Sequence, residues 1–478
     1  MGVRPHVVIV GAGFGGLAVA RDLAELPVEV SLVDRHNFTT FQPLLYQVAT
    51  SGLNAADVAH PIRGLFHRQR NLHVQRGEVV GLDRDRKAVR LADGREVPYD
   101  HLVVAVGAVA TWFGVPGAAE NATPLYTLDD AVRVRNHVLE RFEAADADRS
   151  LVDSGELNFV VVGGGPTGVE TAGALAELFS VVFARDYPSL GVGRARVVLV
   201  EARDSLLGPF HRTSQRAALD TLRARQVEVR LDESVAEVTP DHVRFGSGEV
   251  LPTRTVIWAA GVRAHPLASS LGLPTRRDGR IEVTPELRVV GHDDIWAVGD
   301  VAAAPDRSGD GVLPQLAPVA MQGGAHVARQ IGRALEGRPA QSFRFHDRGT
   351  MATIGRRSAV AELPAGIRLR GTLAWFAWLG LHLLYLSGLR NRLSVLLNWA
   401  WAYLTWDRGP RLIFGARARD SGRAKGDDVS EADGRQVAEP SDGDRTAAAG
   451  HGGAAVVPDE HGGAAVVPDE HGGAAGGR

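Results

Sequence analysis

The sequence contains two glycine-rich turns, each between an apolar run and a helical pattern. The glycines of the first turn are Gly11, Gly13 and Gly16. In a strand, turn and helix of this kind, the first glycine permits the tight turn, the second lets a pyrophosphate approach the backbone, and the third allows close packing of the helix. Asp34 ends the next apolar run, where its carboxylate can accept hydrogen bonds from a ribose. This order of features predicts a dinucleotide site.

The second turn repeats the construction further along the chain. Its glycines are Gly163, Gly165 and Gly168. The apolar run after it ends in Glu201, which would bond both ribose hydroxyls and repel a 2′-phosphate, so NADH is favoured over NADPH. Arg203 is close enough to weaken that preference. Two turns in one chain predict two dinucleotides, and a nicotinamide donor with a resident flavin is one economical pair.

The elements that must hold these turns follow an alternating order. Apolar runs at 6–10, 28–33, 101–106, 158–162, 196–200 and 255–259 are separated by helical or mixed stretches. This order is typical of α/β architecture with parallel sheets, so we predict two Rossmann-like domains. A helix is expected from Phe14 to about Leu26, and the polar, loop-like stretch 144–156 is expected to be either a linker or the exit from a helix.

Composition restricts how electrons can move through the protein. The 478 residues include no cysteine, which excludes disulfide reductases, thiolate metal sites and cysteine nucleophiles. The net charge of -3 is unevenly distributed, because residues 338–415 carry +8, residues 416–478 carry -5 and the body before them carries -6. We predict neither a metal site nor nucleic-acid binding.

The basic segment is also rich in aromatic residues. Uncharged runs at 372–389 and 393–406 contain five of the eight tryptophans. Tryptophan favours the boundary between lipid and water, and arginine can meet anionic lipid. We therefore predict a helical pair that lies in the membrane interface; a transmembrane hairpin and a buried core or homodimer face are the alternatives. The residues expected at the membrane are Trp375, Trp378, Trp399 and Trp401.

The C-terminal tail has a different character. Residues 451–460 and 461–470 are the same decapeptide, and a truncated third copy follows. Too little apolar surface is present to offset the entropy of ordering, so we predict that 416–478 is disordered. Its histidines could suggest a metal tract, but a repeat expansion explains them better because no second ligand lies at metal-site spacing.

A third motif resembles the flavoproteins that have two dinucleotide-binding domains. The predicted strand at 295–298 ends in Gly299 and Asp300. The resemblance implies that Asp300 binds the flavin ribityl chain, that the first turn binds FAD and that the second binds NADH. Segments 103–108 and 258–262, the latter with Gly261, look like the crossover strands between the two domains.

Further motifs narrow the resemblance. The segments 41–50, 163–170, 317–322 and 374–399 together resemble those of bacterial type II NADH:quinone oxidoreductases, in the same order, over about 1–415. That family implies FAD, NADH and a quinone, and peripheral attachment to the cytoplasmic face of the membrane without proton pumping. The acidic repeat tail lies outside the resemblance.

The resemblance also implies roles for individual residues. Glu170 would be a catalytic residue near nicotinamide and flavin, where it could orient nicotinamide or relay protons to quinol, and Gln47 would lie beside the flavin. Gln322 is the second catalytic candidate, because it lies at an expected helix start whose backbone amides could stabilise the charge of reduced flavin. Ala317 and Gln322 would line the quinone entrance, although Pro318 stands where the family often has glutamine. Each of these residues also has a simpler explanation. Glu170 could complement a helix dipole, and Gln47 could be a turn residue. The segment around Gln322 could be an ordinary helix start.

The expected domain order follows from these motifs. The FAD-binding domain would comprise 1–113 and 263–337, the NADH-binding domain 114–262, and the membrane-anchoring region 338–415. Two other functions stay open: an NADH-dependent reductase of a soluble ferredoxin or rubredoxin, for which the basic segment would be the docking surface, and a redox-sensing flavoprotein.

Overall fold

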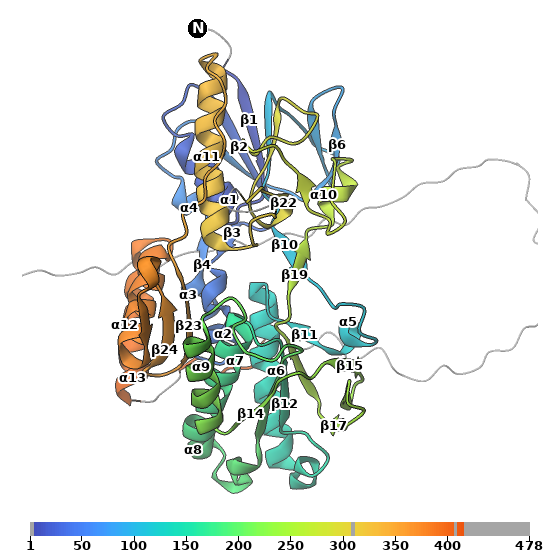
Figure 1. Cartoon of the computed structure of the whole chain (residues 1–478), viewed down its shortest axis with the longest axis vertical. Coiled ribbons are helices and arrows are strands. Elements are labelled where there is room, and N and C mark those ends of the chain that lie inside the picture. The colour runs from blue at the N-terminus through green and yellow to red at the C-terminus, as the bar shows by residue number, and fades with distance from the viewer. Residues whose placement is uncertain (1–3, 307–310, 406–408, 415–478) are drawn as a thin grey trace, which may run out of the picture. The chain divides into compact units, whose positions relative to one another are not determined.

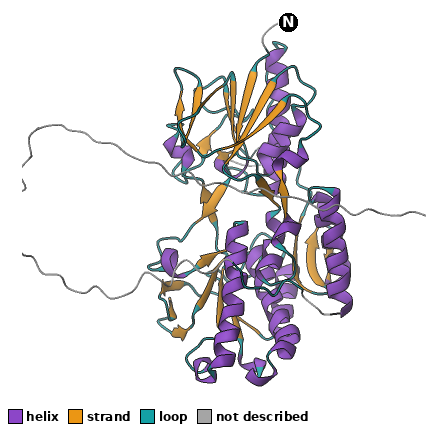
Figure 2. Ribbon diagram, turned by 180° about the vertical axis from the view of Figure 1, so that it is seen from behind, coloured by secondary structure: helices purple, strands orange, loops and turns teal. Residues whose placement is uncertain are grey.

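The computed structural model describes residues 4–306, 311–405 and 409–414. The predicted disordered tail, 416–478, lies outside the described residues. Figure 1 labels the elements, and Figure 2 gives the view from behind.

The first sheet is parallel and has the order β21-β9-β1-β2-β5. Its strands are β1 (His6–Val10), β2 (Glu29–Asp34), β5 (Leu72–Arg76), β9 (His101–Val104) and β21 (Ile295–Ala297). The central strands are buried on both faces, as expected of a parallel sheet covered by other elements. Strand β21 thus returns to this sheet from almost 200 residues further along the chain than β9.

Helices α1 (Phe14–Asp22) and α11 (Ala317–Leu335) pack closely together beside this sheet. A Cβ atom at Gly324 would lie 2.3 Å from the carbonyl oxygen of Gly15, so this contact needs a helix surface without a side chain. Helix α1 ends at Asp22, four residues before the predicted end. Helix α11 begins at Ala317, so the prediction of a helix start at Met321–Gly324 was wrong.

The second sheet is also parallel, with the order β11-β18-β12-β13-β14. Its strands are β11 (Thr123–Pro124), β12 (Asn158–Val162), β13 (Arg196–Val200), β14 (Val227–Arg230) and β18 (Thr255–Trp258). Its helices are α6 (Leu128–Ala147), α7 (Pro166–Glu177) and α9 (Arg212–Ala224). Helix α6 extends to Ala147, so the polar stretch 144–156 is the exit from a helix, one of the two predicted alternatives; a capping box at Thr127 and Asp130 starts this helix.

Two short strands form an antiparallel pair where the chain passes between the two sheets. Strand β10 (Ala108–Ala110) pairs with β19 (Val262–Ala264). Each is preceded by a glycine with positive φ, Gly107 at 72° and Gly261 at 73°. A Cβ atom at Gly261 would lie 2.7 Å from the ring of Phe113, so a side chain here would have to displace that ring and adopt a strained positive φ.

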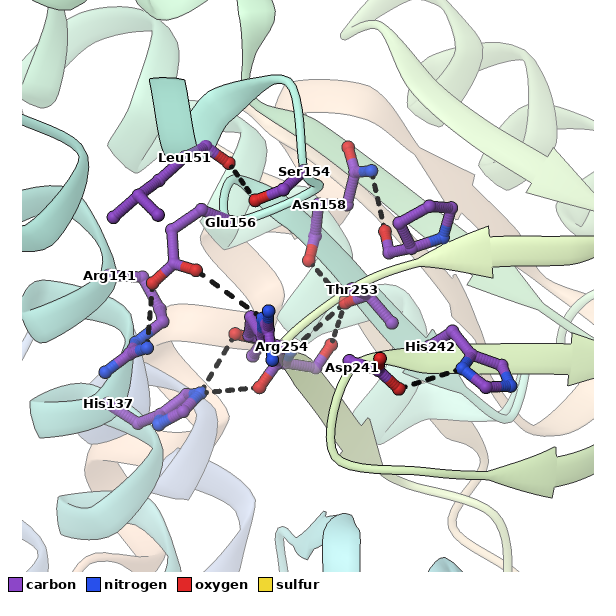
Figure 3. Close-up of polar contacts among 12 residues, drawn as sticks. His137, Arg141, Leu151, Ser154, Glu156, Asn158, Asp241, His242, Thr253 and Arg254 are labelled. Atoms are coloured by element: carbon purple, nitrogen blue, oxygen red, sulfur yellow. Dashed lines mark hydrogen bonds and ion pairs between the residues drawn. The ribbon is translucent and has the colours of Figure 1, made fainter. Parts of the chain in front are cut away.

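A polar network fixes α6 to the second sheet at the amino ends of β12 and β18 (Figure 3). The Glu156 carboxylate accepts a hydrogen bond from Arg141 at 2.7 Å and lies 3.8 Å from Arg254. His137 contacts the Arg254 carbonyl oxygen at 2.9 Å, and burial lowers the pKa of its imidazole. These groups lie at the edge opposite the glycine turn, so we assign them to the support of the domain.

Smaller elements surround the two sheets. Antiparallel sheets are formed by β3 (Phe38–Thr40) with β4 (Ala59–Pro61), by β6 (Val79–Asp83), β7 (Ala88–Leu91) and β8 (Glu96–Pro98), and by β15 (Val235–Val238), β16 (His242–Phe245) and β17 (Val250–Pro252). Strands β20 (Ile281–Glu282) and β22 (Ala302–Ala303) form a parallel pair. The short helices include α2 (Leu45–Ala49), α3 (Ala55–Val58), α4 (Ile62–Leu65), α5 (Ala118–Asn121), α8 (Ala184–Asp186) and α10 (Leu267–Ser270).

The C-terminal region combines a small sheet with a helix pair. Strands β23 (Thr350–Gly355), β24 (Ser358–Glu362) and β25 (Arg368–Arg370) are antiparallel, and α12 (Gly371–Tyr385) packs on β24. Helix α13 (Leu389–Thr405) lies beside α12 (Figure 1). The sequence patterns had not indicated the small sheet.

Three of the four tryptophans predicted to lie at the membrane are buried in the structure. Trp375, Trp378 and Trp399 are 6%, 1% and 4% exposed, so the expectation that they meet the membrane was wrong. Trp401 is 62% exposed. Trp378 and Trp399 instead pack between the helix pair and the body of the protein, and Trp375 packs against the small sheet and Tyr403 of α13. A large aromatic ring serves a core as well as a membrane boundary.

Helix length bears on the alternative of a transmembrane hairpin. Among the described residues, the segment Pro166–Asp186 alone is long and apolar enough to cross a membrane, and most of it is buried within the protein as a core helix. Helices α12 and α13 have 15 and 17 residues, short of the roughly 20 that a span requires.

Candidate functional site

The two glycine turns have the same geometry. Gly11 and Gly163 have φ values of 102° and 110°. A Cβ atom at Gly16 would lie 1.9 Å from the carbonyl oxygen of Gly11, and one at Gly168 would lie 1.8 Å from that of Gly163. Each helix can therefore start against its own turn only because the third glycine has no side chain.

The second glycine of each turn, unlike the third, lies beside open space. No atom lies within 4 Å of a Cβ atom built at Gly13 or at Gly165. Both residues are the N-caps of their helices, where backbone amides lack partners in the helix. Open space beside free amides at a helix N-terminus is the environment that a pyrophosphate needs, so both turns fit the dinucleotides that the sequence predicts.

The two acids lie where the sequence analysis expected them. Asp34 ends β2 and accepts hydrogen bonds from the amides of Ala12 and His36, each at 2.7 Å. Glu201 follows β13 and accepts from the amides of Gly164 at 2.6 Å and Arg203 at 3.0 Å. These bonds hold each carboxylate beside its turn, which is where a nucleotide ribose would lie.

Asp300 lies in the short 3-10 helix Gly299–Val301, directly after β21. Its carboxylate accepts a hydrogen bond from the Tyr126 hydroxyl at 3.4 Å, and the Gln315 amide donates to its backbone oxygen at 2.9 Å. Burial raises the pKa of the Asp300 carboxyl, and the bond from Tyr126 opposes that rise. Tyr126 was not among the predicted site residues, because a single tyrosine before a helix carries no motif.

Glu170 is buried at the junction between α7 and the C-terminal region. The Thr353 amide of β23 donates to its carboxylate at 3.2 Å. Burial raises the pKa of Glu170 to about 8, while the Thr353 amide and the Trp378 indole act in the opposite direction. A glutamate that only complements the helix dipole would be exposed at the helix start, whereas Glu170 is buried. The helix dipole alone therefore explains this position poorly.

Gln47 also lies in this junction, on α2. Its amide oxygen accepts a hydrogen bond from the Trp399 indole at 2.7 Å, and its amide nitrogen donates to the Tyr46 hydroxyl at 2.8 Å. All three side chains are buried. The amide therefore joins α2 to α13, and its predicted contact with a flavin stays a prediction.

Aromatic side chains surround these groups. The imidazole of His382 stacks on Trp378 with a centroid distance of 4.0 Å, and the Phe41 ring meets it edge-on at 6.1 Å. Burial lowers the pKa of His382 to about 4, so this imidazole is neutral at physiological pH. The sequence analysis missed His382 and Tyr46; their positions within the motif segments were the available signal.

The residues predicted for the quinone entrance lie on α11. Ala317 and Pro318 form its first turn, where the missing amide of proline costs no helical bond. The Gln322 side chain donates to the carbonyl oxygen of His346 at 2.9 Å and accepts from the His346 amide at 3.0 Å. Gln322 therefore fastens the chain that leads to β23, and its role toward quinone stays a prediction.

Comparisons with known proteins agree with this geometry. The family model of pyridine nucleotide-disulphide oxidoreductases matches residues 5–324, and the model of the NDH2 C-terminal domain matches 347–405. The type II NADH:quinone oxidoreductase NdhA of Mycobacterium tuberculosis is 37% identical over 430 residues, which cover 86% of this chain and 90% of that protein. The protein Ndh of the same organism, with the same description, is 36% identical over 425 residues, covering 86% and 90%.

The chain belongs to the type II NADH:quinone oxidoreductase family. A solved structure of NDH2 from Plasmodium falciparum in complex with NADH has a TM-score of 0.78 and 20% identity, covering 86% of this chain and all of that one, which shows the shared fold. As a member of this family the protein is an oxidoreductase that uses a flavin and NADH.

Gly165 and Gly168 of the second turn should respond differently to alanine if that turn binds NADH, as the sequence predicts. Gly165→Ala should leave the unfolding temperature of the nucleotide-free protein nearly unchanged and weaken NADH binding at least about tenfold, because the methyl group would occupy the open space. Gly168→Ala should lower the unfolding temperature, since its Cβ would collide with the Gly163 carbonyl oxygen. Calorimetry without NADH and titration with NADH measure both effects. Gly13→Ala, in the first turn, is the control for NADH binding; equal loss of stability in both second-turn variants would contradict the predicted difference between the two glycines.

The buried carboxyl of this oxidoreductase should also make stability depend on pH. The folded-state pKa of Glu170 is raised from 4.5 to about 8, so the unfolded chain releases this proton at lower pH than the folded protein does. The contribution of Glu170 to stability is therefore greatest below about pH 4.5 and falls as pH rises to about 8. Glu170→Gln should gain unfolding temperature relative to wild type across that window, as measured by calorimetry. Glu282→Gln, at an exposed position, is the control; a constant difference between E170Q and wild type at all pH values would contradict the burial argument.

Proposed function

We propose that this protein transfers two electrons from NADH through FAD to a membrane quinone, menaquinone or ubiquinone, without pumping protons. The observation that carries the proposal is the buried junction in which Glu170 of the NADH-side helix α7 meets β23 and α12 of the C-terminal region. It joins a nucleotide-binding helix to the helix pair that bears an apolar outer face. The names of the Mycobacterium tuberculosis relatives support the donor and the acceptor.

The first turn is assigned to FAD and the second to NADH. Gly11, Gly13 and Gly16 would receive the FAD pyrophosphate, with Asp34 at the ribose and Asp300 at the ribityl chain. Gly163, Gly165, Gly168 and Glu201 would hold NADH in the corresponding way. The bound FAD supplies a group that accepts hydride and can pass two electrons onward. We assign the FAD-binding domain to 1–113 and 263–337, the NADH-binding domain to 114–262 and the anchoring region to 338–415.

The chain's own residues would bind and orient the reactants. The Glu170 carboxyl, neutral over most of the physiological pH range because of its burial, can hold a proton near the NADH turn. Backbone amides at the start of α11, near Ala317, can face a quinone oxygen, and Gln322 keeps the following segment in place. Aromatic rings of Trp378 and Phe41 exclude water from the junction.

We assign the outer face of α12 and α13 to the cytoplasmic surface of the membrane, to which the protein would attach peripherally. Exposed apolar side chains gather on this face: Leu373, Phe376, Leu384, Leu389, Leu393, Leu396, Leu397, Trp401 and Leu404. Arg390 in the first turn of α13 is exposed and can meet anionic headgroups. Contiguous apolar surface of this kind marks a membrane or protein contact. A second copy of the chain is the alternative occupant.

Steady-state turnover tests the proposed reaction. Purified protein with bound FAD should oxidise NADH much faster than NADPH when a menaquinone or ubiquinone analogue is present, because the Glu201 carboxylate opposes a 2′-phosphate. Anionic lipid should raise the rate with long-chain quinone. Glu201→Gln should narrow the preference for NADH, measured as the ratio of the two kcat/KM values. Transfer to a soluble ferredoxin or rubredoxin without quinone turnover would instead support a soluble-carrier reductase, and slow flavin reduction without turnover a redox sensor.

Vesicle flotation tests the membrane assignment separately. Replacing Leu393 and Leu397 together with glutamate should abolish flotation with phosphatidylglycerol vesicles, because charge on this face opposes insertion. The matched control is Val250→Glu on β17, an exposed apolar site away from the pair. If the double variant floats normally but dissociates a dimer in analytical ultracentrifugation, this face is a subunit contact.

A further inference from the structure

An exposed phenylalanine follows the first of the two strands that pass between the sheets. Phe113 lies in the loop that leads from β10 to α5 (Figure 1), and 68% of its surface is exposed. Its φ angle is 51°, in the left-handed region that a bulky side chain rarely adopts. Such a conformation costs free energy and persists only where the surrounding structure imposes it. Exposure and backbone strain together indicate that this ring does more than pack.

The residues on both sides of Phe113 are fixed in place. The Trp112 ring packs on Trp258, at the end of β18, with a centroid distance of 5.5 Å. The Trp258 indole nitrogen donates to the Thr111 carbonyl oxygen at 2.8 Å, and the Val115 amide donates to the Trp112 carbonyl oxygen at 3.0 Å. Trp112 and Val115 also pack against the core of the second sheet. The loop therefore holds Phe113 in one position while its ring stays outside the core.

The Phe113 ring lies against the turn that follows β18. A Cβ atom at Gly261 would lie 2.7 Å from the Cζ atom of Phe113, so the ring contacts this glycine. The same turn borders the second glycine-rich turn, because a Cβ atom at Gly163 would lie 2.8 Å from the Cα atom of Ala260. Ala260 and Gly261 are consecutive residues. The ring is therefore next to the backbone that adjoins the turn assigned above to NADH.

The order of the second sheet decides which half of NADH would lie beside Phe113. In a doubly wound sheet, a dinucleotide crosses the carboxyl ends of the strands where the strand order reverses, which here is between β12 and β18. Glu201 follows β13 and marks the side of the adenosine ribose. Strand β18 lies on the other side of β12. The end of β18, with Gly261 and Phe113 beside it, therefore faces the nicotinamide half.

We propose that Phe113 is a binding residue for the nicotinamide riboside half of NADH, against which its ring packs beside Gly261. The inference rests on the proposed function, because that function assigns the second turn to NADH. An aromatic ring held in advance by its loop gains contact with the ligand and loses little conformational freedom on binding. The adenosine half lies on the side of Glu201 and does not meet the ring.

Binding titrations of the FAD-bound protein test the inference without turnover. The probes are NAD⁺, which carries the nicotinamide half and does not reduce oxidised flavin, and ADP, which lacks that half. Phe113→Ala should weaken NAD⁺ binding by about threefold to tenfold, the effect of one aromatic contact, and should leave ADP binding unchanged. Phe376→Ala is the matched control, a phenylalanine of α12 that is 61% exposed, and it should affect neither ligand. Unchanged NAD⁺ affinity in F113A, or equal weakening of both ligands, would overturn the proposal.

Thermal unfolding separates ligand binding from a purely structural role. Glycine adopts a positive φ without the steric cost of a Cβ atom, so Phe113→Gly relieves the strain at this position. Without nucleotide, F113G should unfold at the same temperature as wild type or a higher one, and NAD⁺ should stabilise it less. A lower unfolding temperature with normal NAD⁺ affinity would assign Phe113 to the fold and overturn the proposal. A wild-type protein that binds neither NAD⁺ nor NADH would instead contradict the proposed function, and with it this inference.

Discussion

The burial of Trp378 and Trp399 against α2 and α7 is the interaction on which the site depends. These two indoles bring the C-terminal helices to the nucleotide-binding body, and they close the space in which Glu170, Tyr46 and Gln47 lie. A carboxyl in such a space stays protonated to unusually high pH because its charged form loses hydration. Packing and proton affinity therefore have the same origin here.

The polar contacts around the junction explain how an apolar helix pair finds one position. Asp57 binds α13 through two side chains, and Thr353 of the small sheet binds α7 through Glu170. At the end of α7, Glu177 forms an ion pair with Arg225 and accepts a hydrogen bond from the Arg356 amide. Apolar burial supplies attraction without direction, whereas buried hydrogen bonds are lost in any other register. The combination selects a single arrangement.

Much of the fold could be predicted from the sequence. The strands at 6–10, 158–162 and 196–200 have the predicted bounds, because a glycine turn and an apolar run are local signals. The polar stretch 144–156 is the exit from α6, one of two predicted alternatives, because alanine and aspartate continue the helix to Ala147 without any breaking residue. The tryptophans were misassigned because both sides of α12 are apolar, so periodicity cannot separate the inner face from the outer one. Tyr126 and His382 become site residues only through tertiary contacts, which no local pattern encodes.

Helix α7 carries a constraint on how this chain can vary. Its first turn borders the open space beside Gly165, its fifth residue enters the junction, and its last residue forms an ion pair with Arg225. Each residue added to a helix rotates everything beyond it by about 100°. A single insertion between Glu170 and Glu177 would turn the ion pair away from its partner, and one between Gly168 and Glu170 would move the carboxyl out of the junction. The length of this helix is therefore set from both ends, and variation in the chain should accumulate in the connections around it.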